Sequence, residues 1–115
     1  MDSNTQVTID LSGAIPIVTA MGELDIATAP MLLERMNDLP IGTTSVIVDL
    51  SAVTFLDSTA LGALIACEKR LENGNDRASV HLVISRAEIL KLFDITGLSD
   101  VFPITPTLEE AIAEA

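Results

Sequence analysis

The chain has 115 residues, of which 49% are hydrophobic and 20% charged, and this size and composition predict one folded domain spanning residues 1–115 rather than a disordered chain. Its formal net charge of -11, from 17 acidic and 6 basic residues, and its lack of Tyr and Trp disfavour direct nucleic-acid binding. No apolar stretch approaches the roughly 18 residues of a membrane span, and the single cysteine, Cys67, excludes a disulfide framework and a cysteine-based zinc site.

The first residues, M-D-S-N-T-Q, lack a basic region followed by an apolar one, so we expect no secretion signal and a cytoplasmic protein.

The segment that follows predicts a β-hairpin. Apolar and polar residues alternate over residues 7–11, and a second run covers residues 15–21 after a Ser-Gly pair typical of turns. Pro16 lacks an N–H group and therefore suits a strand start or a sheet edge.

A turn and a first helix are expected next. Residues 22–25, G-E-L-D, are expected to turn the chain, and Thr28 opens a helix in which Pro30 lies in the first turn, where its missing donor is harmless. The apolar side of this helix consists of Leu32, Leu33, Met36 and Leu39. Pro40 and Gly42 end the helix.

The centre of the chain predicts a buried strand followed by a second helix. Residues 46–48 form an uninterrupted apolar run, Leu50 follows Asp49, and a short loop leads to a helical pattern beginning at Asp57 and Ser58. Apolar residues fall on one side of this helix: Ala60, Leu61, Leu64, Ile65, Cys67 and Leu71. The other side carries Ser58, Gly62, Ala66 and Lys69.

The outward side of this helix predicts a docking face. Gly62 inside a helix costs about 1 kcal/mol relative to alanine, but it lets another surface approach closely. Ser58 lies in the first turn, whose unpaired N–H groups and partial positive charge favour an added phosphate. A serine in this place is also a common N-cap. Two interpretations stay open: Ser58, Gly62 and Ala66 form a docking face, or Ser58 only caps the helix.

The C-terminal third continues the alternation of strands and helices. Turn formers at residues 73–76 end the second helix, and residues 79–84 predict a strand. Ser85 with Glu88 predicts a capping box for a helix that ends near Gly97. A short strand is expected over residues 101–104, and Thr107 with Glu110 predicts a second capping box for a terminal helix. The pattern is α/β: a mixed sheet of four to five strands with an N-terminal hairpin and about four helices packed mainly on one face.

Three catalytic chemistries are disfavoured, so we expect no enzyme, no cofactor and no metal site. A serine hydrolase needs a base for Ser58, but the only histidine, His81, lies in another predicted strand and G-x-S-x-G is absent. Neither nucleotide-binding glycine motif is present. Asp49 resembles the aspartate of a phosphoaspartate receiver, but no paired acidic residues at an earlier strand end supply the magnesium site.

Three segments together resemble the STAS domain family, and within it the bacterial anti-sigma factor antagonists. They are residues 22–25 (G-E-L-D), residues 55–62 (F-L-D-S-T-A-L-G), and residues 90–103 (L-K-L-F-D-I-T-G-L-S-D-V-F-P) followed by L-E-E-A at residues 108–111. They occur in order and span nearly the whole chain. The central D-S-T-A-L-G is the most specific of the three.

The resemblance implies a phosphorylation switch at Ser58. In the family, the serine at this position is phosphorylated by an anti-sigma factor that is also an ATP-dependent serine kinase; the unphosphorylated form binds that partner and frees the sigma factor. A metal-dependent serine phosphatase resets the switch. Thr59 is a neighbouring hydroxyl that is a second candidate for the phosphate. Glu23 and Asp25 match a loop that lies near the serine in the family, and these two residues, Asp57 and Thr59 are candidate partner contacts.

An alternative from another class stays open on the same resemblance. The protein would then be a STAS adaptor subunit of a stress-signalling scaffold or a lipid-transport complex, with Ser58 serving only as a helix cap.

Overall fold

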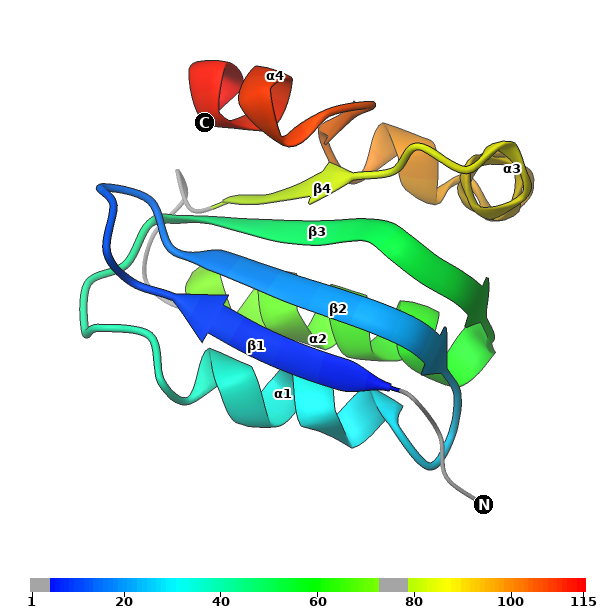
Figure 1. The fold of residues 1–115 in the computed structure, drawn as a ribbon, viewed down its shortest axis with the longest axis horizontal. Coiled ribbons are helices and arrows are strands. Elements are labelled where there is room, and N and C mark those ends of the chain that lie inside the picture. Colours follow the sequence, from blue (N-terminus) through cyan, green and yellow to red (C-terminus); the bar gives the residue numbers. More distant parts are fainter. Residues whose placement is uncertain (1–4, 73–78) are drawn as a thin grey trace.

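The computed structural model describes residues 5–72 and 79–115, and Figure 1 shows their arrangement. The elements in chain order are β1 (Gln6–Asp10), β2 (Ile17–Leu24), α1 (Ala29–Met36), β3 (Ser45–Leu56), α2 (Ser58–Glu72), β4 (Ser79–Val83), α3 (Ala87–Thr96), a 3-10 turn (Leu98–Asp100), β5 (Ile104–Thr105) and α4 (Leu108–Glu114). The sheet order is β1-β2-β3-β4-β5. β1 runs antiparallel to β2, and the other neighbours are parallel, so the predicted mixed α/β sheet is confirmed. The turn predicted at residues 73–76 lies outside the described residues.

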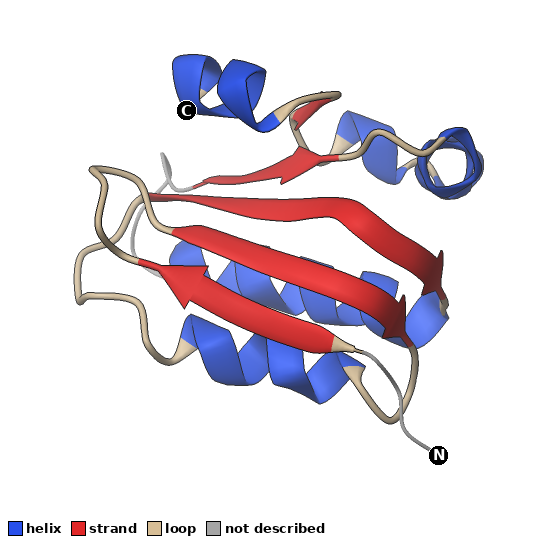
Figure 2. Cartoon of the chain, viewed as in Figure 1, coloured by secondary structure: helices blue, strands red, loops and turns tan. Residues whose placement is uncertain are grey.

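Helices lie on both faces of the sheet, but mainly on one (Figure 2). The main hydrophobic core joins strand residues to Leu32 of α1, Leu64 of α2 and Phe93 of α3, which are all fully buried. A smaller cluster on the opposite face joins Ala111 of α4 to Ile47 and Val83. Within residues 5–72 and 79–115, no helix is both long and apolar enough to cross a membrane.

The central strand is longer than predicted, and the predicted turn is wrong for residues 22–24. β3 continues past Leu50 to Leu56, because it pairs in parallel with β2 as far as Leu24 opposite Leu56. Gly22 therefore belongs to β2, where its φ of 89° accompanies a shift in the strand register. The turn itself begins at Asp25. At the same end of this pairing, β3 ends at Leu56 and α2 begins at Ser58, with one residue between them.

One of the two predicted capping boxes is wrong. α3 begins at Ala87 with Arg86 at its N-cap and no side-chain cap bond, so Glu88 is the second helical residue rather than the third, and Ser85 lies outside the helix. In α4 the predicted cap is confirmed, because the Thr107 side chain accepts a hydrogen bond from the Glu110 N–H.

The last strand begins three residues later than predicted. β5 covers only Ile104–Thr105, and the chain before it forms the 3-10 turn. The Phe102 N–H donates to the Leu98 carbonyl at 3.1 Å and is therefore not available to a strand partner, while its side chain is 2% exposed and packs edge to face on Phe93, with ring centroids 6.4 Å apart.

Candidate functional site

The hydroxyl of Ser58 is exposed at the first residue of α2, and Asp57 rather than Ser58 caps this helix. Oδ1 of Asp57 accepts a hydrogen bond from the Ala60 N–H at 3.1 Å, and its carbonyl accepts one from the Leu61 N–H. The Ser58 hydroxyl forms no hydrogen bond with any residue that the structure describes. The interpretation of Ser58 as a cap is therefore wrong, because the acceptor that a cap must supply comes from the preceding carboxylate.

Replacing Asp57 by alanine should destabilise the fold by about 1 kcal/mol, because the Ala60 N–H loses its acceptor. Urea denaturation measures this change, and Ser58→Ala is the matched control, since its hydroxyl makes no bond in the cap. A larger loss for Ser58→Ala than for Asp57→Ala would contradict the assignment of the cap.

A row of small side chains continues from Ser58 along the outer side of α2. Ser58, Gly62 and Ala66 are spaced four residues apart, so they lie one above another, and all three are exposed. A Cβ atom added to Gly62 would meet no other atom within 4 Å. We call these three residues the small-residue row. Another protein can reach it, because no other element of the described chain lies over Gly62.

The opposite side of α2 is buried as predicted. Ala60, Leu61, Leu64 and Cys67 lie in the main core, together with Ala63, which the periodicity did not single out. Ile65 is only half-buried. Burial raises the pKa of the Cys67 thiol to about 12, so this cysteine stays protonated as an inert core residue.

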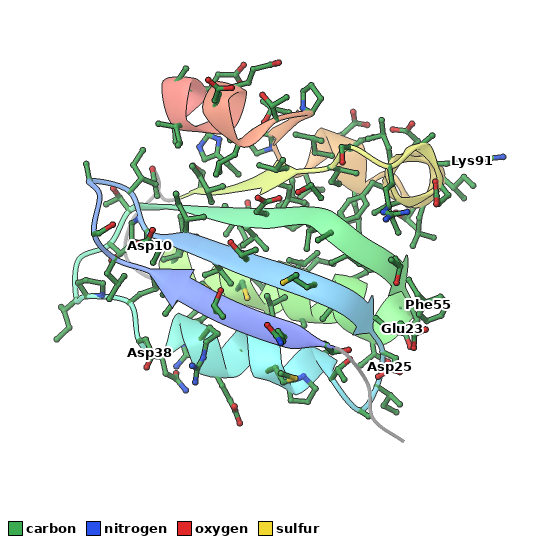
Figure 3. All side chains as sticks on the ribbon, viewed as in Figure 1. Asp10, Glu23, Asp25, Asp38, Phe55 and Lys91 are labelled. Atoms are coloured by element: carbon green, nitrogen blue, oxygen red, sulfur yellow. The ribbon has the colours of Figure 1, made fainter. Side chains whose placement is uncertain are left out.

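The end of β2 lies against the start of α2. The Asp57 N–H donates to the Leu24 carbonyl at 3.2 Å, and Glu23 pairs with Phe55 across the two parallel strands. Figure 3 shows Glu23, Asp25 and Phe55 together at the carboxyl ends of β2 and β3. The structure thus brings Glu23, Asp25 and Asp57 to the same edge of the sheet as Ser58.

Asp25 organises the turn between β2 and α1. Its Oδ1 accepts hydrogen bonds from the N–H groups of Ala27 and Thr28 and from the Thr28 hydroxyl at 3.0 Å. These bonds, the Thr28 hydroxyl foremost, hold the pKa of the Asp25 carboxyl below its usual range. Asp25 therefore shapes the turn that presents Glu23, and Glu23 is the more exposed of the two acids.

Three exposed apolar residues near this edge were not among the predicted site residues. Phe55 is 49% exposed, Met21 43% and Ile26 76%. Phe55 occurs in the central motif, but its position beside Glu23 depends on pairing between two strands that are distant in sequence. The only local sign that Phe55 is exposed is its position next to Leu56, an apolar residue that faces the core, because neighbouring strand residues point to opposite faces.

His81 and Ser58 lie too far apart to act together. His81 pairs with Ile47 near the start of β3, and its Nε2 lies 3.0 Å from the Ser79 hydroxyl. Ser58 follows the last residue of β3, about 30 Å away at the usual rise per strand residue. A serine hydrolase with His81 as its base is therefore excluded by geometry.

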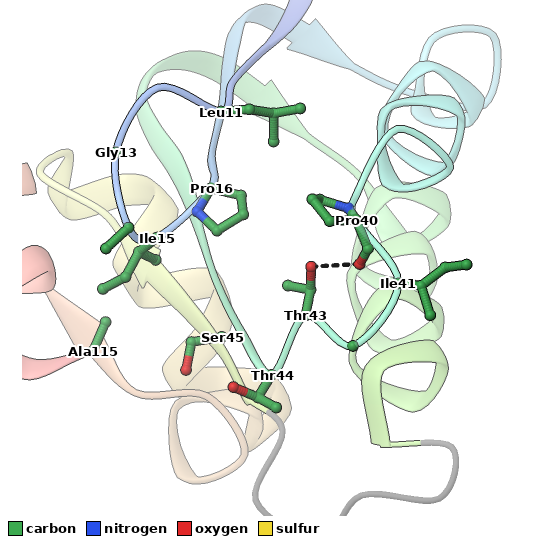
Figure 4. Close-up of a pocket in the computed structure, with 12 residues that line it drawn as sticks. Leu11, Gly13, Ile15, Pro16, Pro40, Ile41, Thr43, Thr44, Ser45 and Ala115 are labelled. Carbon is green, nitrogen blue, oxygen red and sulfur yellow. Dashed lines mark hydrogen bonds between the residues drawn. The ribbon is translucent and has the colours of Figure 1, made fainter.

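A pocket of about 420 Å³ lies at the far end of the molecule and is separate from this site. It is lined by the loop after β1 and by residues 40–45, where the Thr43 hydroxyl donates to the Pro40 carbonyl at 2.6 Å (Figure 4). Ser45, one of its lining residues, starts β3, whereas Ser58 follows the end of the same strand.

Comparison with known proteins places this arrangement in a family. The sequence profile of the STAS domain matches residues 6–111. The anti-sigma-B factor antagonist of Staphylococcus epidermidis is 41% identical over 89 residues, which are 76% of this chain and 81% of that protein. The anti-sigma-B factor antagonist of Bacillus subtilis is 30% identical over 95 residues, which are 83% of this chain and 85% of that protein.

A solved structure agrees with the sequence comparison. The crystal structure of an anti-sigma factor antagonist from Mycobacterium paratuberculosis superposes with a TM-score of 0.85 at 27% identity, and the match covers 96% of this chain and 93% of that one. The element order, the mixed sheet and the extent of these matches lead to one conclusion: this chain belongs to the STAS domain family.

Proposed function

We propose that this protein is an anti-sigma factor antagonist that is switched by phosphorylation of Ser58. Its unphosphorylated form binds an anti-sigma factor that is also an ATP-dependent serine kinase, and the sigma factor is released. The observation that carries the proposal is the exposed Ser58 hydroxyl, which is not used by the helix cap and which begins the small-residue row. The curated relatives, named anti-sigma-B factor antagonists, support the same partner class.

The chemistry of the helix start favours a phosphorylated Ser58 that changes partner binding over one that unfolds the protein. A phosphate adds about -1.5 to -2 charges, and a helix N-terminus accepts negative charge. The fold therefore tolerates the modification, whereas a partner packed on the row must desolvate the phosphate beside Asp57. A factor of ten in affinity needs only about 1.4 kcal/mol, so a penalty of a few kcal/mol releases a micromolar partner. A metal-dependent serine phosphatase would restore the binding form.

Phosphorylation mapping tests this proposal. The purified protein is incubated with ATP and the anti-sigma factor from the same genome, and intact mass followed by peptide mapping locates the phosphate. We expect one phosphate on Ser58 in the wild type and in Thr59→Val, and none in Ser58→Ala. Phosphate on Thr59 alone, or undiminished labelling of Ser58→Ala, would overturn Ser58 as the switch.

The adaptor alternative has less support. It required Ser58 to serve only as a helix cap, and Asp57 supplies that cap. A role in sigma factor regulation also implies action where transcription occurs, so we propose the cytoplasm as its location.

A further inference from the structure

Phe55 differs from the other aromatic residues of the chain. The chain has three Phe and no Tyr or Trp. Phe93 and Phe102 are 0% and 2% exposed and pack against each other in the core, whereas Phe55 is 49% exposed at the end of β3. Phe55 therefore keeps about half of its surface outside the core. Aromatic side chains are enriched among the residues that dominate the binding energy of protein interfaces.

Phe55 belongs to a patch on the sheet face opposite α1 and α2. Leu24 and Leu56 are buried in the main core, so the residues that precede them, Glu23 and Phe55, point to the other face. Met21 lies two residues before Glu23 on the same strand and is 43% exposed on that face. We call Met21, Glu23 and Phe55 the sheet-end patch. It adjoins Ser58, which follows Phe55 by only two intervening residues.

The charged residues that flank the sheet-end patch on β2, on the turn after it and at the start of α2 are all acidic, whereas the basic residues Arg86 and Lys91 lie at the start of α3 and within it, after β4. Glu23 lies within it, and Asp25 and Asp57 border it on the turn and at the start of α2. Between residues 1 and 68 the only basic residue of the sequence is Arg35, which lies in the last turn of α1, at the opposite end of that helix from the Asp25 turn. An apolar centre with an acidic border fits a partner surface with an apolar pocket and a basic border.

The backbone beneath the patch is fixed before any partner arrives. The Glu23 carbonyl accepts hydrogen bonds from the hydroxyls of Thr5 and Thr28, both at 2.8 Å. The Leu24 carbonyl accepts one from the Asp57 N–H. A preorganised surface loses little conformational entropy on binding, which favours its use as a docking site.

From these observations we infer that the anti-sigma factor contacts the sheet-end patch as well as the small-residue row, and that Phe55 is the apolar anchor of the complex. The partner receives the ring in an apolar pocket bordered by Lys or Arg side chains. This inference rests on the proposed function and adds a second surface on the other side of Ser58. The row lies on the outer side of α2 and the patch on the opposite face of the sheet, so one partner contacts both only by covering the edge where they meet, at the Asp57–Ser58 junction, which also brings its active site to the hydroxyl.

Binding measurements on Phe55 variants test this inference. The probe is the purified anti-sigma factor from the same genome, titrated without ATP so that no phosphoryl transfer occurs. We expect Phe55→Ala to bind about 10- to 100-fold more weakly than the wild type, and Phe55→Leu to lose less, because it keeps an apolar side chain. Ile41→Ala is the matched control, since Ile41 is fully exposed at the far end of the molecule, and its affinity should stay within about twofold of the wild type. Added salt should weaken wild-type binding.

The outcomes separate this inference from the proposed function. Wild-type affinity for Phe55→Ala, together with lost binding of Ser58→Asp, would overturn the anchor and leave the switch intact. Weakened Phe55→Ala with full binding of Ser58→Asp would support the anchor and overturn the switch. An anti-sigma factor that does not bind the wild type would overturn both. Urea denaturation of each variant confirms that the fold is retained, because only folded variants enter the comparison.

Discussion

Ser58→Asp should bind the anti-sigma factor at least about 100-fold more weakly than the wild type, whereas Ser58→Ala should bind at least as tightly as the wild type. The aspartate places a charge on the small-residue row beside Asp57, and the partner must desolvate this charge when it docks. The desolvation costs a few kcal/mol, and each 1.4 kcal/mol lowers the affinity about tenfold. The alanine keeps the row flat and cannot be phosphorylated. Isothermal titration with the purified anti-sigma factor measures both affinities.

A charge placed elsewhere provides the control for this experiment. Thr44 is exposed just before β3, at the opposite end of that strand from Ser58. Thr44→Asp changes the net charge by the same amount as Ser58→Asp and should leave the affinity within about twofold of the wild type. A similar loss for both variants would show that net charge, rather than the position of Ser58, governs binding.

Gly62→Leu should lose affinity for the anti-sigma factor by a similar factor while the protein becomes slightly more stable. A leucine side chain at this position would stand out of the small-residue row and hold the partner away, because nothing in the described chain covers it. Leucine is also a better helix former than glycine, by up to about 1 kcal/mol. Titration measures the affinity, and urea denaturation measures the stability in the same samples.

Gly13 offers a matched control for the glycine substitution. It lies in the loop after β1 and also has open space around an added Cβ. Gly13→Leu should therefore leave the affinity unchanged, while Gly62→Ala should gain stability and lose less affinity than Gly62→Leu. Full binding by Gly62→Leu would show that the partner does not cover this part of α2.

The element order could be predicted from the sequence because hydrophobic periodicity is local. The continuation of β3 from Leu50 to Leu56 could not, since this part contains Ser51 and Thr54 and depends on pairing with β2. The same pairing moves Gly22 out of the predicted turn and into β2. The errors at residues 22–24 and 51–56 therefore arise where pairing with a distant strand decides the structure.

The site could be predicted only in part, for a similar reason. The outward row of α2 follows from helical spacing, and its exposure at Ser58, Gly62 and Ala66 agrees with that prediction. The cap did not follow, because Asp57 and Ser58 are neighbours and both residue types are good N-caps, so the sequence cannot tell which of them precedes the first helical turn. Phe55 was not identified as a contact residue because its exposure depends on which face of the sheet is covered.

Titration of one protein in two states tests directly whether phosphate on Ser58 switches binding. The wild-type protein, phosphorylated by its kinase and then purified, is titrated against the anti-sigma factor beside the unphosphorylated protein. We expect tight binding by the unphosphorylated form and an affinity at least about 100-fold weaker for the form carrying phosphate on Ser58. Equal affinity of the two forms would contradict this switch.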